Sequence, residues 1–190
     1  MALAQEKYYT FGDILNGDES ERVELIDGQV YLMAPPTRAH QEILTALFLQ
    51  LGEFLADKPC KVYPAPFGVR LFEEKNDIPE NSDTMVEPDI SVICDHDKLD
   101  DLGCKGAPDL VIEILSPSTQ RHDRVTKFNL YERAGVREYW IVDPERQTVQ
   151  VHTLEENRYY AGESYGSAAQ ISVGVLPGCV IDLGPVFPRA

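Results

Sequence analysis

PDLVIEIL, residues 108–115, reads as a strand that is buried on both faces and has one acidic side chain inside it. Side chains alternate between the two faces of a strand, and both sets are apolar here apart from Glu113. Two apolar faces are typical of a strand at the centre of a sheet that is covered on both sides. An ionised carboxylate is costly there unless it is paired or binds a metal ion. A structural ion pair and a metal ligand are therefore both open for Glu113.

A second short strand, VEPDISVIC at residues 86–94, has an acidic residue at its start. Taken alone, Asp89 is typical of a turn or of the first position of a strand after a proline. Together with Glu113, it lets two neighbouring strands present oxygen ligands to the same cation. Mg²⁺ is commonly held by one or two carboxylates, with waters and substrate phosphates as further ligands. The pair therefore predicts a divalent-cation site able to activate water and to offset phosphodiester charge.

A helix is expected after these strands, from about Asp123 to Ala134, and Gly135 ends it. Asp123, Lys127 and Tyr131 are spaced i, i+4 and i+8, so they share one helix face. This face can bring a cationic group next to the acidic strands. The alternative is a solvated Asp–Lys pair, worth roughly a few tenths of a kcal/mol.

Hairpins and a long helix surround these elements in the sequence. RVELIDGQVYLM, residues 22–33, has Asp27-Gly28 between two alternating apolar runs and predicts a hairpin. EYWIVDPERQTVQVHTL, residues 138–154, predicts another. Thr37 fits the N-cap of a helix that reaches about Asp57, with apolar residues at helical spacing.

The order of elements predicts the fold class. Residues 61–72 are expected to form one strand, and short strand-like runs lie near Ile171 and Val180. Strands before and after two helices indicate an α/β or α+β fold, with a mixed β-sheet flanked by helices. Additional β-hairpins are expected toward the N- and C-termini. The length predicts a single domain over residues 1–190.

Composition indicates an ordinary globular protein of the cytoplasm. Hydrophobic residues make up 43% of the chain, and no run approaches the length of a membrane span. The N-terminus lacks the basic start and apolar stretch of a secretory signal. The chain has four cysteines and no CxxC pair, so we expect reduced thiols. The cysteines are Cys60, Cys94, Cys104 and Cys179.

A formal net charge of −15 limits how the chain can bind nucleic acid. Binding driven by counterion release from phosphates usually needs a basic surface, which the chain as a whole lacks. The segment 121–137 departs from the average, since it contains five Lys or Arg residues against Asp123 and Glu132. Any contact with a polyanion is therefore expected in this segment or at a bound divalent cation.

These motifs resemble the PD-(D/E)XK nuclease superfamily and, within it, the Uma-type family of restriction-endonuclease-like proteins. The resemblance covers nearly the whole chain and is carried by the blocks ELIDGQVYLMAPP, HQEIL, VEPDISVI, GAPDLVIEILSPST and DRVTKFNLYERAGVREYWIVDP. Pro88-Asp89 and Glu113 match the superfamily motif, whereas Leu115 stands at its lysine position. In the family the lysine has moved to the following helix, where Lys127 matches.

The resemblance implies a restriction-endonuclease-like fold and a metal-dependent endonuclease that hydrolyses DNA. Asp89 and Glu113 would ligate Mg²⁺ or Mn²⁺, with the backbone carbonyl of Ile114 as a third protein ligand. Lys127 would orient or deprotonate the attacking water, because a lysine near a buried site can have a lowered pKa. Such a protein works on DNA away from membranes, and a homodimer would let two sites cut opposite strands.

Three further residues receive auxiliary roles from the resemblance. Glu24, in the first hairpin, matches an acidic residue that supports the metal from an early element. His40 lies in the first helical turn, among unpaired backbone N–H groups that favour phosphate. Tyr131 would orient Lys127 or contact substrate.

Two other functions stay open. The chain can be a catalytically inactive nuclease fold that serves as a DNA-binding or accessory module, which the net charge and the shifted lysine favour. A structural zinc site is a weaker alternative, because its spacing matches no established pattern. Its ligands would be Cys60, Cys94, His96 and Cys104.

Overall fold

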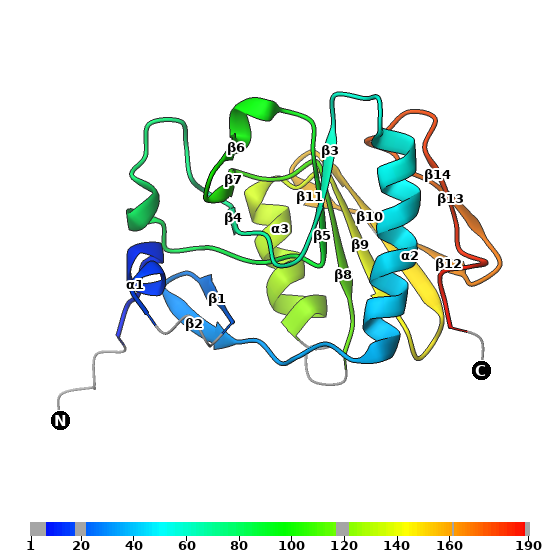
Figure 1. Cartoon of the computed structure of the whole chain (residues 1–190), viewed down its shortest axis with the longest axis horizontal. Coiled ribbons are helices and arrows are strands. Elements are labelled where there is room, and N and C mark those ends of the chain that lie inside the picture. Colours follow the sequence, from blue (N-terminus) through cyan, green and yellow to red (C-terminus); the bar gives the residue numbers. More distant parts are fainter. Residues whose placement is uncertain (1–6, 18–21, 117–121, 161, 189–190) are drawn as a thin grey trace.

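A mixed β-sheet forms the centre of the molecule (Figure 1). The computed structural model describes residues 7–17, 22–116, 122–160 and 162–188. In this part of the chain the strands follow the order β11-β10-β9-β8-β5-β3, and β12 also pairs with β10. Strands β8 and β9 are parallel, and the other neighbours are antiparallel. The strands are β3 (Lys61–Pro64), β5 (Ile90–Ile93), β8 (Leu110–Ile114), β9 (Glu138–Asp143), β10 (Thr148–Glu155), β11 (Arg158–Tyr159) and β12 (Glu163–Gly166).

Strand β8 is the central strand that the sequence predicts. It is hydrogen-bonded to β5 on one edge and to β9 on the other, and all five of its residues are buried. Ile112 packs into the core cluster that contains the long helix, whereas Val111 packs with Leu130 of the second helix. Glu113 lies on the same strand face as Val111, because the two residues are two positions apart.

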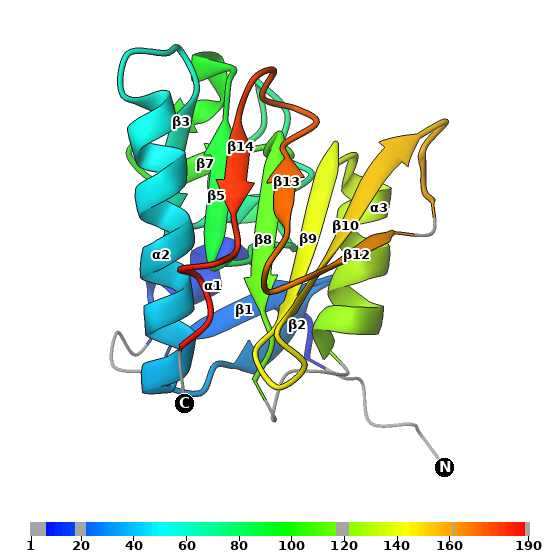
Figure 2. The ribbon, with the colours of Figure 1, turned by 90° about the vertical axis from the view of Figure 1, so that its right-hand side faces the viewer.

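Helices and short strands cover both faces of the sheet (Figures 1 and 2). Helix α2 (Arg38–Leu55) and the paired strands β13 (Gln170–Ser172) and β14 (Val180–Asp182) cover one face. On the other face lie the π-helical turn η3 (His122–Lys127), helix α3 (Phe128–Ala134) and a three-stranded sheet. None of the described helices is long and apolar enough to cross a membrane. The three-stranded sheet consists of β4 (Val69–Arg70), β7 (Gly103–Lys105) and β6 (Leu99–Asp100), and the chain also forms the 3-10 turns η1 (Pro79–Asn81) and η2 (His96–Lys98).

The N-terminal hairpin is tied to the segment that leads through Asp89 into β5. It consists of β1 (Val23–Ile26) and β2 (Gln29–Leu32), with helix α1 (Phe11–Leu15) next to it in the chain. Its turn places Asp27 and Gly28 at positive φ, as the sequence predicts for a two-residue turn. Leu25 exchanges two 2.7 Å backbone hydrogen bonds with Met85. The hairpin is therefore held against the segment that leads into β5.

The single strand expected over residues 61–72 is wrong. Strand β3 ends at Pro64, the Ala65–Pro66 peptide bond is cis, and β4 belongs to the separate sheet β4-β7-β6. Apolar alternation continues through both strands in the sequence, so it does not reveal that the chain leaves one sheet for another between them.

The expectation of four reduced thiols is also wrong. Cys60 and Cys94 form a disulfide, while Cys104 and Cys179 are free and buried. Lys61 pairs with Ile93 in the antiparallel β3–β5 ladder, so the next position along each strand brings the two cysteines opposite each other. Their spacing of 34 residues hides this proximity in the sequence. The bridge uses two of the four ligands that a zinc site would need, so the zinc alternative is wrong as well.

Candidate metal-dependent active site

Asp89, immediately before β5, lies opposite Glu113 of the adjacent strand β8. Ile90 pairs with Ile112 in the antiparallel ladder, and one further step in this register places Asp89 against Glu113. Directly opposed residues in an antiparallel pair point to the same face of the sheet. The backbone N–H of Ile114 donates a 2.7 Å hydrogen bond to Asp89 Oδ2, which fixes that carboxylate to β8. The structure thus brings together the two acids that the sequence singled out.

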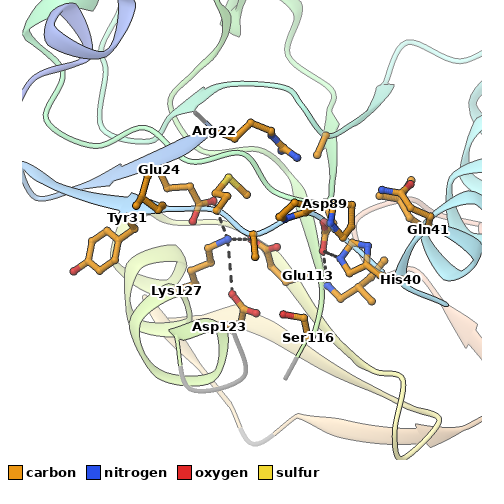
Figure 3. Close-up of a pocket in the computed structure, with 18 residues that line it drawn as sticks. Arg22, Glu24, Tyr31, His40, Gln41, Asp89, Glu113, Ser116, Asp123 and Lys127 are labelled. Carbon is orange, nitrogen blue, oxygen red and sulfur yellow. Dashed lines mark hydrogen bonds and ion pairs between the residues drawn. The ribbon is translucent and has the colours of Figure 1, made fainter. Parts of the chain in front are cut away.

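The turn η3 and helix α3 bring Asp123, Lys127 and Tyr131 into the cluster around Glu113, and Figure 3 shows the first two of them. Lys127 Nζ lies 2.9 Å from Glu113 Oε1, and the hydroxyl of Tyr131 donates to the same oxygen at 2.6 Å. Asp123 Oδ1 lies 3.8 Å from Lys127 Nζ. All three side chains are buried, so the alternative of a solvated Asp–Lys pair is wrong. Lys127 lies where the π-helical turn meets the α-helix, a feature frequent at functional sites.

Glu24 enters this cluster from strand β1. Its Oε1 lies 2.8 Å from Lys127 Nζ and also accepts a 3.1 Å hydrogen bond from the backbone N–H of Glu87. Three carboxylates, those of Glu24, Glu113 and Asp123, therefore surround the single ammonium group of Lys127. Asp89 adds a fourth carboxylate close by, as Figure 3 shows.

This surplus of carboxylates determines the protonation state of Lys127. Burial by itself would lower its pKa, but the charges of Glu113, Glu24 and Asp123 outweigh burial and raise its pKa well above the ordinary value. A lysine held in its charged form is a poor base at neutral pH. The expected lowered pKa is therefore wrong, whereas the role of Lys127 in orienting or deprotonating the attacking water stays a prediction. Burial, and then the charges of Glu113 and Glu24, raise the pKa of Tyr131 well above its ordinary value, so its hydroxyl stays a hydrogen-bond donor.

The buried, negatively charged surroundings of Glu113 raise the pKa of its carboxyl. Burial, and then the charges of Asp89, Asp123 and Glu24, raise its pKa to about 8, although Lys127 opposes the shift. The metal-free site therefore holds a proton on Glu113 more tightly than an exposed glutamate would. A cation bound beside Glu113 would replace this proton.

The raised pKa predicts how stability depends on pH in EDTA. A glutamate titrates near 4.5 in the unfolded chain, so the stabilisation from the neutral Glu113 carboxyl is complete below that pH and is lost as pH rises through about 8. Lys127 stays charged across this range. Glu113→Gln keeps the neutral form, so its free energy of unfolding should rise relative to wild type by up to about 1.4 kcal/mol per pH unit. Urea unfolding between about pH 5 and about pH 8 measures this difference. A difference independent of pH would contradict the buried, raised pKa.

His40 contacts Asp89 instead of offering helix N–H groups to a phosphate. Its Nε2 lies 3.0 Å from Asp89 Oδ2. Its backbone N–H already donates to the N-cap hydroxyl of Thr37, so the expected unpaired donor is wrong at this position. Within the described residues, the buried Nδ1 of His40 has no hydrogen-bond partner. The contact with Asp89 indicates that His40 fixes the orientation of this carboxylate.

The cluster opens into a cavity of about 280 Å³ between the N-terminal hairpin, the start of α2 and the ends of β5 and β8. It is lined by Asp89, Glu113, Ile114, Lys127, Glu24 and His40, and also by residues outside the sequence predictions, among them Arg22, Tyr31 and Ser116. Tyr131 reaches Glu113 from behind this lining. The alternation Arg22–Glu24 in the first hairpin strand is the one sequence signal that points to Arg22, because residues two apart share a strand face.

The donor set of this cavity fits a hard divalent cation. Asp89 Oδ1 and Glu113 Oε2 make no hydrogen bond to any described residue, whereas the second oxygen of each carboxylate is fixed by protein donors. Four carboxylates against one lysine leave a surplus of negative charge. The described residues contain no group of three or more His, Cys, Asp or Glu side chains arranged to hold a metal. Two carboxylates meet the need of Mg²⁺, which keeps several waters.

Comparisons with known proteins agree with this fold. The model of the Uma2 family, described as "Putative restriction endonuclease", matches residues 7–184. A solved structure from Anabaena variabilis ATCC 29413, of "a putative nuclease belonging to DUF820", superposes with a TM-score of 0.73 at 20% identity, covering 94% of this chain and 97% of that one. This likeness shows the restriction-endonuclease-like mixed α/β fold.

Two sequence relatives come from Synechocystis sp. (strain ATCC 27184 / PCC 6803 / Kazusa), and both are named "Uncharacterized protein". The first, slr1290, is 30% identical over 113 residues, which are 60% of this chain and 55% of the relative's length. The second, sll1609, is 24% identical over 148 residues, or 75% of this chain and 79% of the relative. On the family match over residues 7–184, the chain belongs to the Uma2 family of restriction-endonuclease-like proteins.

Proposed function

We propose that this protein is a Mg²⁺- or Mn²⁺-dependent endonuclease that hydrolyses phosphodiester bonds of DNA in the cavity. The observation that carries the proposal is the pair of opposed carboxylates, Asp89 and Glu113, each with one oxygen fixed and the other open to a ligand. Membership of a restriction-endonuclease-like family supports hydrolysis of nucleic acid as the reaction.

The cation would be held by Asp89 Oδ1, Glu113 Oε2 and the backbone carbonyl of Ile114, whose residue lines the same cavity. When bound, it would supply the Lewis acidity that activates water and offsets charge on the phosphodiester. The protein keeps these ligands in place through neighbouring donors. Ile114 N–H and His40 hold Asp89 Oδ2, and Lys127 and Tyr131 hold Glu113 Oε1.

Lys127 and Glu24 complete the site electrostatically. Lys127 stays protonated and offsets the charge of the carboxylates when the cation is absent or exchanging. Glu24 holds Lys127 from the N-terminal hairpin and also accepts from the backbone of Glu87, two residues before Asp89. Its role is therefore to position the lysine and the Asp89 segment together.

The direct test is cleavage of supercoiled plasmid by the purified protein. Nicking is expected with Mg²⁺ or Mn²⁺ and is expected to stop in EDTA, because the carboxylates cannot activate water without the cation. Analysis of the nicked product on an agarose gel measures the rate. Nicking that persists in EDTA would contradict the metal dependence.

The second candidate is a nuclease fold that binds DNA without cutting it. The net charge of −15 predicts that DNA binding is weak, whether or not the protein cuts the DNA. The basic segment expected to contact DNA is largely neutralised, since Arg124, Arg133 and Arg137 each form an ion pair with an aspartate. A binding module should retain plasmid equally well with Mg²⁺ and in EDTA, and should not nick it.

Whether two copies of the chain act together as a homodimer stays a prediction.

A further inference from the structure

Binding a phosphate in the cavity needs a positively charged side chain, and Lys127 is already engaged by the protein's own carboxylates. An ammonium group has three N–H donors. Lys127 lies within 4 Å of three carboxylates, at 2.8 Å from Glu24, 2.9 Å from Glu113 and 3.8 Å from Asp123. It is also buried beneath them, with a side chain only 4% exposed. Its charge therefore balances the protein's own carboxylates.

Arg22 is the other arginine or lysine among the described residues that line the cavity. Its Nε and Nη2 both donate to one oxygen, Glu87 Oε2, at 3.0 and 2.6 Å. Nη1 has no partner among the described residues, and 41% of the side chain is exposed. Figure 3 shows the guanidinium reaching over the cavity on the side of Asp89. A guanidinium fixed along one edge and open along another is suited to bind an oxyanion.

The position of Arg22 is set by the elements that build the metal site. Its carbonyl accepts a 2.9 Å hydrogen bond from the backbone N–H of Met33, which extends the β1–β2 hairpin by one pair. Its partner Glu87 precedes Pro88-Asp89 and donates its own N–H to Glu24. Arg22 is therefore coupled to the β1–β2 hairpin, which carries Glu24, and to the segment that carries Asp89. The fold thereby fixes its distance from Asp89.

We propose that Arg22 binds a non-bridging oxygen of the phosphodiester at this site through its open guanidinium edge, while Glu87 holds the opposite edge. This proposal rests on the proposed nuclease function and assigns the phosphate contact to Arg22 instead of Lys127. Arg22 then stabilises the substrate phosphate, and Lys127 stabilises the metal ligands. Loss of Arg22 should weaken substrate binding without affecting the cation.

The test compares Arg22→Gln, Arg22→Lys and the control Arg38→Gln. Arg38 also pairs with a glutamate, Glu42, but it is 83% exposed and lies outside the cavity lining. The probe is a short fluorescein-labelled DNA oligonucleotide, used as single strand and as duplex, titrated in Ca²⁺ and read by anisotropy. Parallel calorimetry measures Mn²⁺ binding, and plasmid nicking in Mg²⁺ measures the reaction.

Arg22→Gln is expected to weaken oligonucleotide binding by about tenfold to a hundredfold, the range for a charge-assisted hydrogen bond. Mn²⁺ affinity should stay as in wild type, Arg22→Lys should recover part of the loss, and Arg38→Gln should bind like wild type. Equal binding by wild type and Arg22→Gln, or a loss of Mn²⁺ binding in Arg22→Gln, would overturn the proposal.

The two proposals fail in different ways. Nicking by wild type with unchanged binding and nicking in Arg22→Gln would leave the nuclease function standing and remove the role of Arg22. Oligonucleotide binding that depends on Arg22, without nicking by wild type, would keep the phosphate contact and remove the nuclease function. Wild-type protein that neither binds nor cuts the DNA would overturn both.

Discussion

Glu113→Gln is expected to slow plasmid nicking by at least about a thousandfold, which corresponds to roughly 4 kcal/mol of transition-state stabilisation. Glutamine keeps the size of the side chain and can still accept from Tyr131, but it removes the charge that holds the cation. Lewis acidity and activation of water depend on that cation and supply several kcal/mol. Gel-based nicking rates in Mg²⁺ measure the effect. The variant should fold, because glutamine matches the neutral carboxyl that burial favours when it raises the pKa of Glu113 to about 8.

Glu138→Gln is the matched control for this variant. Glu138 is a second buried glutamate of the same sheet whose pKa is raised by burial, and its oxygens accept from Trp140 and from the backbone of Val175. It does not line the cavity. Its substitution should alter stability and leave nicking unchanged. Nicking by Glu113→Gln at the wild-type rate would show that Glu113 is a structural ion-pair partner.

Lys127→Met is expected to affect stability and activity together. The substitution leaves the side chains of Glu24, Glu113 and Asp123 buried without the positively charged ammonium group between them. Breaking a buried charge cluster by removing one partner costs about 3–5 kcal/mol. Nicking should fall by about a hundredfold or more, the scale of losing a preorganised charge. Mn²⁺ should restore more stability in the variant than in wild type, because it supplies the missing positive charge.

Urea unfolding in EDTA and in Mn²⁺ measures this second effect. Lys61→Met serves as control, since Lys61 is exposed and forms no ion pair within the described residues, and surface changes of this kind stay within about 0.5 kcal/mol. A Lys127→Met protein as stable as wild type in EDTA would mean that the Lys127 ammonium group does not stabilise the buried carboxylates around it. That outcome would remove the electrostatic argument for a cation in the cavity.

The sequence predicts the centre of this molecule well, because the centre depends on local patterns. Apolar residues on both faces of 110–114 identify the middle strand, and Thr37 marks the start of the long helix within one residue. Asp89 and Glu113 stand out because a carboxylate in or next to a buried strand is costly unless it is paired or binds a metal ion. The spacing of Asp123, Lys127 and Tyr131 places them on one face without reference to any other element.

Features that depend on distant partners are not visible in the sequence. Arg22 and Glu87 are 65 residues apart, and Cys60 and Cys94 are 34 apart, so only the folded chain brings each pair together. The sequence mispredicts the pKa of Lys127 for the same reason. Burial alone lowers a lysine pKa, and the raised value results from carboxylates that arrive from β1, β8 and η3. Auxiliary roles for Glu24 and His40 are predicted only through the family resemblance, since neither residue stands out locally.

The most direct test of the account is calorimetric titration of Mn²⁺ into wild type, Asp89→Asn and Asp109→Asn. Both aspartates follow a proline before a strand of the same sheet, yet Asp109 accepts from Cys94 N–H and lies outside the cavity lining. We expect Mn²⁺ binding by wild type and by Asp109→Asn, and none by Asp89→Asn. Equal Mn²⁺ binding by all three proteins, or none by wild type, would contradict a cation site built on Asp89 and Glu113.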